Sequence, residues 1–560
     1  MTPTRVEASS SATNTATKSS DSSPANTEAT NNREAVALLR RLTYGPRLGD
    51  VGWLNTLGLH GWLDAQLAPD DSADVDLKRR LDALKLPIKY AAGPNTPAPN
   101  GVVQSWPAVD EQGQLMYVQA PIETAWKVVD RSVAMDNAAR RRPRDEVIAA
   151  TLLRAVYSRW QLREVIVNFW HDHFNVDAYS SDQITAALPS YDRDVIRAHA
   201  FGNFREFLEA VATSTAMQFY LSNRSSRAGA ANENYARELF ELHTLGSAAY
   251  LNDRYDRWRD VPGALNGKPS GYIDQDVYEA ARAFTGWTVA DGTRVDNRTQ
   301  LPNTGRFIYV EGWHDGNQKR VLAQDFDPFQ AALADGRKVL DLVAAHPATA
   351  NFVARKLCVR LIGASVSEPT VKMAATVFRD NRQRSDQIAR TIKAIVLAAE
   401  FDKRAPKIQR PLNAMASFVR ATGMDFTPSE GLVNQLSGCG QRLFGWPTPN
   451  GFPDDDSYLI SASALRQRWG LMLGLANNNW KNGTIPIALL EQLNVLTPEA
   501  ASGYWLNNLI GASSAQQQHA IAASTGWALD KPVAPPGGER QKRLARLAGL
   551  CALVPEALLA

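Results

Sequence analysis

Cysteine is scarce in this sequence. The three cysteines, Cys358, Cys439 and Cys551, stand far apart in a chain of 560 residues, and no CxxC pair occurs. A zinc ribbon or a disulfide framework needs several cysteines at close spacing, so the sequence indicates neither kind of structure. At most one disulfide bond can form.

Long apolar runs and an excess of one charge are also missing. No segment approaches the roughly 18 uninterrupted apolar residues of a membrane-spanning helix, so we predict no transmembrane segment. Lys and Arg total 61 against 58 for Asp and Glu, which gives a net charge of +3. This balance gives no reason to expect nucleic acid as a partner, and it is compatible with an acidic or neutral ligand.

The signatures of several common enzyme classes are absent. The sequence contains no GxxxxGK[ST], no GxGxxG after a strand, no GxSxG and no HExxH. These motifs hold phosphates, dinucleotides, a nucleophilic serine and zinc, respectively. Common NTPases, dinucleotide enzymes, serine hydrolases and zincins are therefore unlikely matches to this chain.

Residues 1–31 differ in composition from the rest of the chain. They are rich in Ser, Thr, Ala and Asn and contain almost no large apolar side chain. Such a segment cannot bury enough apolar surface to offset the entropy of ordering, so we predict a disordered tail. It shows no hydrophobic stretch of the kind found in signal peptides.

From Arg33 onward, apolar residues recur mostly at helical spacing, and 44% of all residues are hydrophobic. The best candidate for a short strand or hairpin is "GRFIYVEGWHDG" (305–316), and 101–121 contains a second. The predicted fold class is mainly α, a large multi-helix domain with a small β hairpin insertion. Segments dense in Gly, Pro, Asn and Asp predict loops at 86–101, 251–272 and 444–458.

The segment "NENYARELFELHTLG" (232–246) sets ionisable groups among leucines and aromatics. Asn232 is a predicted N-cap, and the preceding loop of small residues leads to a helix N-terminus, where free N–H groups attract anions. At about 100° per residue, His243 lies away from Glu238, which makes a metal site from this pair poor geometry. One arc instead carries an acidic stripe around an arginine: Glu233, Asn234, Arg237, Glu238 and Glu241. The alternative is a solvated face of ion pairs.

A second segment, "LREVIVNFWHDHFNVDAYSSD" (162–182), reads as a helix with one apolar and one polar face. Its polar face carries Glu164, Asn168, His171 and Asp172, and its apolar face includes Trp170 and His173. On a regular helix the two histidines are roughly opposed. An irregular end at residues 171–175 would let them converge on a metal ion. Otherwise His173 is a core histidine, and His171 beside Asp172 is suited to proton transfer.

A third candidate is the turn "YVEGWHDGNQK", which contains His314 and Asp315 between glycines. Loops on a rigid scaffold often carry binding residues. The alternative is turn chemistry, in which Asp and Gly are present for backbone shape.

The order of these segments resembles the domain-of-unknown-function-1800 family of bacterial proteins, from about Ala35 to about Asn478. The resemblance implies a large, mostly helical domain that is commonly exported to the periplasm or beyond and often encoded beside a sulfatase-like partner, with no generally established reaction. We predict a domain at 32–480 and a C-terminal helical extension at 481–560. The resemblance rests on these motifs: "VIVNFWHDHFNV", "NENYARELFELHTLG", "VYEAARAFTGWTV", "WHDGNQKRVL", "HPATANFVARKLCVRLI" and "PTPNGFPDDDSYLISASALRQRW".

Three functions are compatible with the sequence. The first is a hydrolase or lyase acting on a polysaccharide or similar polar polymer, because carboxylates cluster and 14 tryptophans provide sugar platforms. The second is a divalent-metal enzyme using His171, His173 and Glu238, and the third is a non-catalytic envelope scaffold or binding module. For the first, the catalytic candidates are Asp172, Glu233, Tyr235, Glu238 and Glu241, and the substrate-binding candidates are Trp170, Asn232, Asn234, Arg237, His314 and Asp315.

Overall fold

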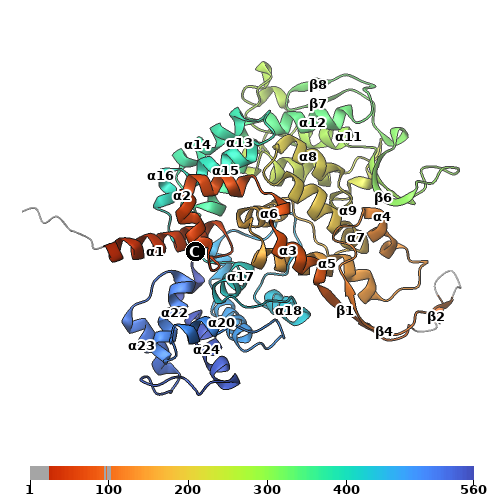
Figure 1. The fold of residues 1–560 in the computed structure, drawn as a ribbon. Helices are drawn as coiled ribbons and strands as arrows, with labels where there is room; N and C mark the ends of the chain where they lie inside the picture. The colour runs from red at the N-terminus through yellow and green to blue at the C-terminus, as the bar shows by residue number, and fades with distance from the viewer. Residues whose placement is uncertain (1–23, 94–95, 98–102) are drawn as a thin grey trace, which may run out of the picture.

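The computed structural model describes residues 24–93, 96–97 and 103–560, and it confirms a mainly α-helical fold with small hairpins (Figure 1). Of the predicted tail, residues 1–23 lie outside the described ranges, and the first helix already begins at Pro24. The helices up to the middle of the chain are α1 Pro24–Leu42, α2 Asp50–Leu67, α3 Val75–Ala83, α4 Ile122–Trp126, α5 Asn137–Tyr157, α6 Gln161–His173, α7 Asp182–Ser190, α8 Phe204–Thr213, α9 Thr215–Tyr220, α10 Glu233–Glu238 and α11 Asp274–Ala283.

The second half of the chain is mainly helical. Many helices begin at a side chain that accepts a backbone N–H, as Asp136 does from Ala138 at the start of α5. The helices are α12 Ala334–Ala345, α13 Pro347–Leu361, α14 Glu368–Asp380, α15 Gln387–Val396, α16 Ala399–Asp402, α17 Pro411–Thr422, α18 Glu430–Gly438, α19 Asp456–Leu459, α20 Ala462–Ala476, α21 Ala488–Gln492, α22 Pro498–Ile510, α23 Ala515–Ser524 and α24 Gly538–Cys551.

The strands of the described ranges form two-stranded antiparallel pairs. The predicted strand within 305–316 is found, because β6 pairs with β5 in register Thr288 to Ile308. The strand predicted within 101–121 is also present, as β4. The prediction of a loop from residue 86 was wrong for its first part, where β1 pairs with β4. The pairs are β1 Lys85–Tyr90 with β4 Val109–Gln114, β2 Thr96–Pro97 with β3 Val103–Gln104, β5 Trp287–Asp291 with β6 Asn303–Tyr309, and β7 Lys319–Val321 with β8 Gln324–Phe326.

Two large hydrophobic clusters hold the helices together. The first contains buried residues of α1, α2, α6 to α8 and α11 to α15, among them Trp170 and Phe207. The second contains residues of α5, α17, α20, α22 and α24, among them Trp505. Helix α5 contributes Val147 to the first cluster and Leu152 to the second, so it lies between them. α6 follows α5 directly and lies near the middle of the molecule (Figure 1).

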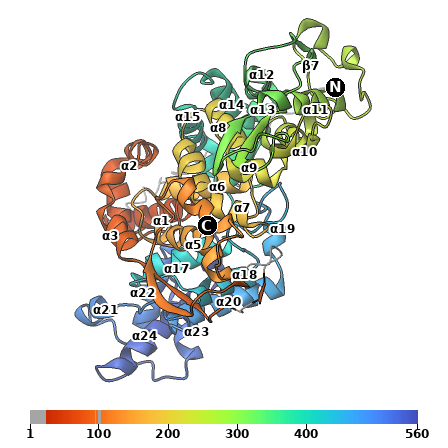
Figure 2. The same cartoon turned by 90° about the vertical axis from the view of Figure 1, so that its right-hand side faces the viewer.

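The C-terminal helices share a core with earlier parts of the chain. Trp505 and Leu506 of α22 are buried in the same cluster as Leu412 and Met415 of α17. Packing therefore continues across the predicted boundary at residue 480. Figure 2 shows α21 and α24 at one end of the molecule and α11 with β7 at the other. In the described part of the chain, no helix has the length and apolar character needed to cross a bilayer.

Candidate functional site

Helix α6 divides into the two faces that its sequence predicts. Leu162, Ile166 and Trp170 are buried in the first hydrophobic cluster. The opposite face meets two groups of charged side chains. The helix stays regular through His173, so the irregular end that would let His171 and His173 converge is not present.

His171 belongs to a buried ion network with Asp192, Arg154, Arg197 and Glu164, which we call the Asp192 network. His171 Nε2 lies 3.0 Å from Asp192 Oδ1, and Asp192 also pairs with Arg197 at 2.9 Å and with Arg154 at 3.1 Å. Arg197 in turn pairs with Glu164 at 2.8 Å. Burial alone would raise the pKa of Asp192, but Arg197, His171 and Arg154 hold it well below its usual range.

The space beside the Asp192 network is small. The cavity that touches His171, Asp192 and Arg197 has a volume of about 10 Å³, and a single water needs roughly 10–15 Å³. A polymer or a sugar does not fit there. The geometry therefore gives His171 a packing role and no route to a substrate.

Asp172 turns to the other group of charges. It forms an ion pair with Arg410, which precedes α17, and Arg410 also pairs with Asp454 at 3.0 Å. Asp454 is held further by Arg360 and Lys407, each at 3.2 Å. Burial raises the pKa of Asp172 even though Arg410 opposes the shift.

His173 is a core histidine. Its Nε2 lies 3.0 Å from the carbonyl oxygen of His243, and its ring is stacked against Phe169 at 6.1 Å. His243 is buried as well, with its ring 6.2 Å from that of His173. Burial lowers the pKa of His243 to about 3, and the charge of Lys356 adds to the shift. Both imidazoles are therefore neutral at neutral pH.

The segment 232–246 is only partly α-helical. Asn232 caps α10 as predicted, with its Oδ1 accepting from the N–H of Asn234 at 2.9 Å. α10 has six residues and continues as a π-helix, η5, over Leu239–His243. The cap uses the N–H of Asn234, and the expectation of an anion contact at this N-terminus stays a prediction. His243 leaves the acidic stripe, in agreement with the sequence, and points into the core.

Arg237 sits in the stripe as an ion-pair centre. Its Nη2 lies 3.2 Å from Glu233 and 3.3 Å from Asp274, whose other oxygen accepts from the hydroxyl of Tyr250 at 2.7 Å. The Arg237 side chain is 36% exposed. Pairs at this exposure contribute at most about 1 kcal/mol. The surface interpretation of the stripe is thus correct for Arg237 and Glu233.

Glu238 and Glu241 behave differently from the rest of the stripe. Both are half-buried, and neither forms a hydrogen bond or ion pair with a residue of the described ranges. Burial raises the pKa of Glu238, the charge of Glu241 adds to the rise, and Arg237 opposes it.

Nearby, the hydroxyl of Tyr272 is buried without a hydrogen-bond partner among the described residues. Burial and the charge of Glu241 raise the Tyr272 pKa, so this phenol keeps its proton.

The loop at residues 444–458 crosses the C-terminal end of α6. Asn175, which follows α6, donates to the carbonyl oxygens of Trp446 and Thr448 at 2.9 Å each. The hydroxyl of Tyr220 donates to the carbonyl oxygen of Pro447 at 3.0 Å. Burial raises the pKa of Tyr220, and the charge of Glu238 contributes to the rise. The 444–458 loop and Glu238 therefore both lie in the neighbourhood of Tyr220.

Three aromatic rings of this loop form a cluster. The centroids of Trp446 and Phe452 are 5.4 Å apart, those of Trp446 and Tyr458 are 5.6 Å apart, and those of Phe452 and Tyr458 are 5.4 Å apart. All three pairs are edge-to-face, a favourable arrangement for aromatic rings. Trp446 is half-buried and Tyr458 is exposed. The cluster therefore presents aromatic surface to solvent.

Gly451 allows the 444–458 loop to approach α6. Its φ is +74°, and a Cβ at this position would lie 1.8 Å from the carbonyl oxygen of Asp172. We predict that Gly451→Ala lowers the free energy of unfolding by at least about 1–2 kcal/mol, the cost of a left-handed backbone for an L-residue. Urea denaturation measures the change. Gly438→Ala is the control, because no atom lies within 4 Å of its Cβ position. Equal stability of the two variants would contradict the prediction.

His314 and Asp315 lie away from the acidic stripe. Asp315 pairs with Arg282 at 2.8 Å, near the end of α11, whereas Arg237 pairs with Asp274 at its start. Eight residues of helix separate these contacts, which is about 12 Å. His314 Nε2 lies 3.2 Å from Asp335, which also accepts from Lys319 at 2.6 Å. The geometry gives these two residues a structural role.

The remaining predicted residues divide between core and rim. Trp170 is fully buried, and its Nε1 donates to the carbonyl oxygen of Ala200 at 3.0 Å. Tyr235 is also buried, which places its hydroxyl out of reach of a polymer. Asn234 donates to the carbonyl oxygen of Leu221 at 3.3 Å, at the rim with Asn232.

The metal interpretation receives no support from this geometry. His171 faces Asp192, while His173 is enclosed by aromatic rings of the core. Across the ranges that the structure describes, no three His, Cys, Asp or Glu side chains gather as a metal ion requires.

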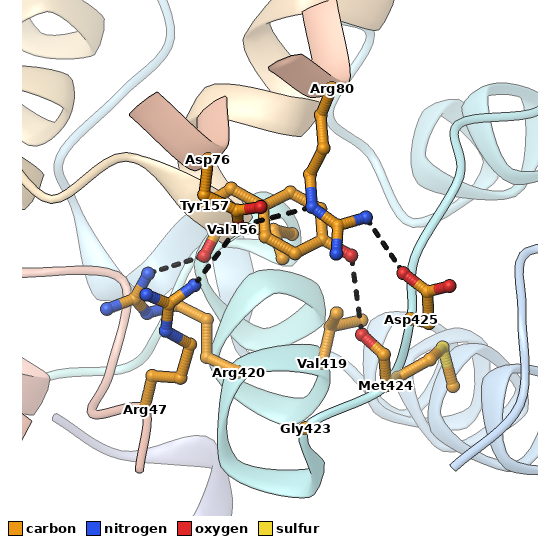
Figure 3. Close-up of a pocket in the computed structure, with 10 residues that line it drawn as sticks. All are labelled: Arg47, Asp76, Arg80, Val156, Tyr157, Val419, Arg420, Gly423, Met424 and Asp425. Atoms are coloured by element: carbon orange, nitrogen blue, oxygen red, sulfur yellow. Dashed lines mark hydrogen bonds and ion pairs between the residues drawn. The ribbon is translucent and has the colours of Figure 1, made fainter. Parts of the chain in front are cut away.

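A cavity of 310 Å³ lies elsewhere, between α3, the end of α5 and the end of α17 (Figure 3). Arg80 lies over the Tyr157 ring at 3.8 Å and pairs with Asp425 at 2.8 Å. Arg420, also in the lining, is buried and pairs with Asp50 at 2.7 Å. None of the residues predicted for the site lines this cavity, and its arginines already have carboxylate partners.

The site residues predicted from the sequence do not include Arg410, Asp454 and Lys356, the charges around Asp172. A signal existed: Arg410 precedes Pro411 at a helix start, and Asp454 belongs to the run "PDDD". Nothing local, however, shows that these segments meet. Arg410 and Asp172 are 238 residues apart in the chain.

These features define a mainly helical protein whose candidate site lies where α10 and η5 and the 444–458 loop meet the end of α6. The chain belongs to the family described as protein of unknown function (DUF1800), whose model matches residues 37–556. The match includes most of the predicted C-terminal extension. No curated protein and no solved structure matches the chain. Export and a sulfatase-like partner are not tested by these comparisons and stay predictions.

Proposed function

We propose that the protein is a hydrolase that cleaves glycosidic bonds in a polysaccharide or a similar polar polymer. Glu238 is the proton donor, and Glu241 is the second carboxylate. The observation that carries this proposal is the environment of Glu238: burial and the charge of Glu241 raise its pKa, and no described residue hydrogen-bonds to it. A glycosidase acid must keep its proton near neutral pH, and burial next to another carboxylate achieves this.

The two carboxyl groups suit the two halves of the reaction. Glu238 gives its proton to the departing glycosidic oxygen as the C–O bond breaks. The carboxylate of Glu241 takes a proton from the water molecule that adds to the anomeric carbon. Each product therefore gains one new hydroxyl group where the glycosidic bond was. Glu238 ends α10 and Glu241 lies in the first turn of η5, so the two residues are about one helical turn apart in the chain. The charge of Glu241 acts on the carboxyl group of Glu238, as expected for a glycosidase pair, whose carboxyl groups lie roughly 5–10 Å apart.

The surroundings of Glu238 support a sugar substrate. The aromatic cluster of Trp446, Phe452 and Tyr458 belongs to the loop to which Tyr220 donates a hydrogen bond, and the charge of Glu238 acts on Tyr220. Aromatic rings bind the apolar faces of sugars, while Asn232, Asn234 and Arg237 offer polar contacts at the rim.

Two other carboxylates are less suitable as the second catalytic group. Asp172 is engaged by Arg410, and Glu233 is paired with Arg237. A lyase reaction on the same kind of polymer receives less support than hydrolysis. It would need proton transfer by Tyr235 and His171, and both side chains are buried.

The pH dependence of turnover tests the pairing of Glu238 with Glu241. The rate is expected to fall as pH rises through the raised pKa of Glu238, because the donor must be protonated. The wild-type profile is measured by release of reducing ends from a panel of neutral and acidic polysaccharides. Glu241→Gln removes the second catalytic carboxylate, so its effect is measured on Glu238 directly, by NMR titration of the side-chain carboxyl group. Loss of the Glu241 charge should lower the pKa of Glu238, and an unchanged pKa would contradict the pairing.

A non-catalytic scaffold is the second candidate, and the buried Asp192 network favours it. In that case the charged segments fix helix packing, and Glu238 has no chemical role. The wild-type protein would then release no reducing ends from any member of the panel at any pH, while binding to a polysaccharide without turnover would identify a binding module.

A further inference from the structure

Positive charge accumulates around Asp454. We use the name Asp454 cluster for Asp172, Lys356, Arg360, Lys407, Arg410 and Asp454. A single oxygen, Asp454 Oδ1, lies 3.0 Å from Arg410 Nη2 and 3.2 Å from both Arg360 Nη1 and Lys407 Nζ. The only other carboxylate of the cluster is Asp172, which pairs with Arg410.

Lys356 adds a cation that has no carboxylate partner. It lies on α13 one turn before Arg360, and its Nζ lies 5.5 Å from the centre of the Phe352 ring. It forms no hydrogen bond or ion pair with a residue that the structure describes. Burial lowers its pKa to about 8, and Asp454 and Asp172 oppose the shift. Four cations thus face two carboxylates, which leaves two positive charges uncompensated.

The groups next to the cluster do not supply the missing negative charge. Two carboxylates follow Asp454 directly, but Asp455 is exposed and caps α19, and Asp456 acts on Arg41, so neither pairs with a cation of the cluster. Burial raises the pKa of Tyr44 and lowers those of His173 and His243, so all three are neutral at neutral pH. Asn168, which accepts from Arg360 and Arg410 at 3.3 Å each, is uncharged. In the adjoining Asp192 network the two carboxylates are matched by two arginines. A buried excess of this size is costly without a counter-ion.

Hydrogen-bond donors also lack acceptors here. The Nε–H of Arg410 is buried and has no partner among the described residues. Both ring nitrogens of His243 are likewise buried without a partner, and its neutral ring offers one N–H donor. The cluster is nevertheless accessible, because the side chains of Asp172 and Asp454 are 20% and 19% exposed. Free donors next to a surplus of positive charge are the features of an oxyanion site.

We propose that the Asp454 cluster binds a doubly charged oxyanion, either free phosphate or sulfate or a phosphate monoester on a larger molecule, beside Lys356 and Arg410. The dianion would neutralise the two surplus charges and provide acceptors for the free N–H groups. One carboxylate oxygen of Asp454 is already bound by Arg410, Arg360 and Lys407. These contacts show that the cations of the cluster can bind an anionic oxygen. The proposal does not depend on Glu238 or on glycoside hydrolysis.

Calorimetric titration of the full-length protein with inorganic phosphate and with sulfate, at constant ionic strength set with chloride, tests this site. Saturable binding is expected, with a higher Tm than in the chloride control. Lys356→Gln should weaken binding at least tenfold. The matched control is Lys338→Gln, since Lys338 is also a helical lysine near a phenylalanine ring, at 4.4 Å from Phe326, but outside the cluster. The control should bind like the wild type.

No saturable binding, or equal affinity in Lys356→Gln and wild type, would overturn the proposal. Glu238→Gln should bind phosphate normally, so a failure of the hydrolase proposal leaves this result unchanged. An oligosaccharide that carries a phosphate monoester and competes with inorganic phosphate assigns the site to an ester group of a polymer. Phosphate binding without such competition assigns it to the free ion.

Discussion

Glu238→Gln will lower kcat on the cleaved polysaccharide by about 10²–10⁴-fold, the usual contribution of a positioned acid. Glutamine keeps the shape of the side chain but has no proton to give to the leaving oxygen. The measurement is reducing-end release with the polysaccharide that the wild type cleaves best. Unchanged turnover in this variant would remove Glu238 from the mechanism.

Stability separates this effect from unfolding. The pKa of Glu238 is raised in the folded protein, so its contribution to stability is present at low pH and is lost as pH rises through the folded-state pKa. Glutamine does not ionise, and Glu238→Gln should therefore keep or raise the Tm at neutral pH. Glu233→Gln is the matched control, since Glu233 lies on the same helix and its partner is Arg237. It should retain most of the activity.

Arg410→Met will lower the free energy of unfolding by about 3–5 kcal/mol, because it leaves the mostly buried carboxylate of Asp172 without its ion-pair partner. Asp454 also loses its pair with Arg410 but keeps those with Arg360 and Lys407. Arg355→Met is the control. Arg355 pairs with Glu368, and the two side chains are 39% and 60% exposed, which limits the loss to about 1 kcal/mol.

The shift in urea midpoint between these variants measures the difference. If Arg410→Met and Arg355→Met lose similar stability, the Asp454 cluster does not stabilise the fold through ion pairing. Folding of Arg410→Met is not required for the anion titration, which uses Lys356→Gln instead.

Apolar spacing predicted the local part of the fold. It identified the two faces of α6, because the side chains of a buried helix repeat at 3.6 residues whatever surrounds them. It also identified β6, where Phe307 and Tyr309 face the first cluster. The strand β1, "KLPIKY", was missed because none of its residues is buried. It therefore shows no apolar face, and the segment that follows it is dense in Pro and Gly.

The candidate site was harder to predict because its parts are distant in sequence. Segment 232–246 was recognised from its charges, but the change from α10 to the π-helix η5 depends on packing and not on residue type. The sequence grouped Asp172 with Glu238 by chemistry alone. In the structure, Asp172 pairs with Arg410, whereas Glu238 has no hydrogen-bond or ion-pair partner among the described residues. The pair of Asp172 and Arg410 joins residues 238 positions apart, so no local sequence pattern reveals it.

Apart from the ion pairs of Asp454, the 444–458 loop is attached mainly through its backbone. Asn175, Tyr220 and Arg410 all donate to carbonyl oxygens of the loop, namely those of Trp446, Pro447, Thr448, Phe452 and Pro453. A carbonyl oxygen is present whatever the side chain. Exchange of Trp446 or Tyr458 can therefore alter what the loop recognises while its attachment persists, and ligand preference can diverge among proteins built on this scaffold without a matching change in the helices beneath.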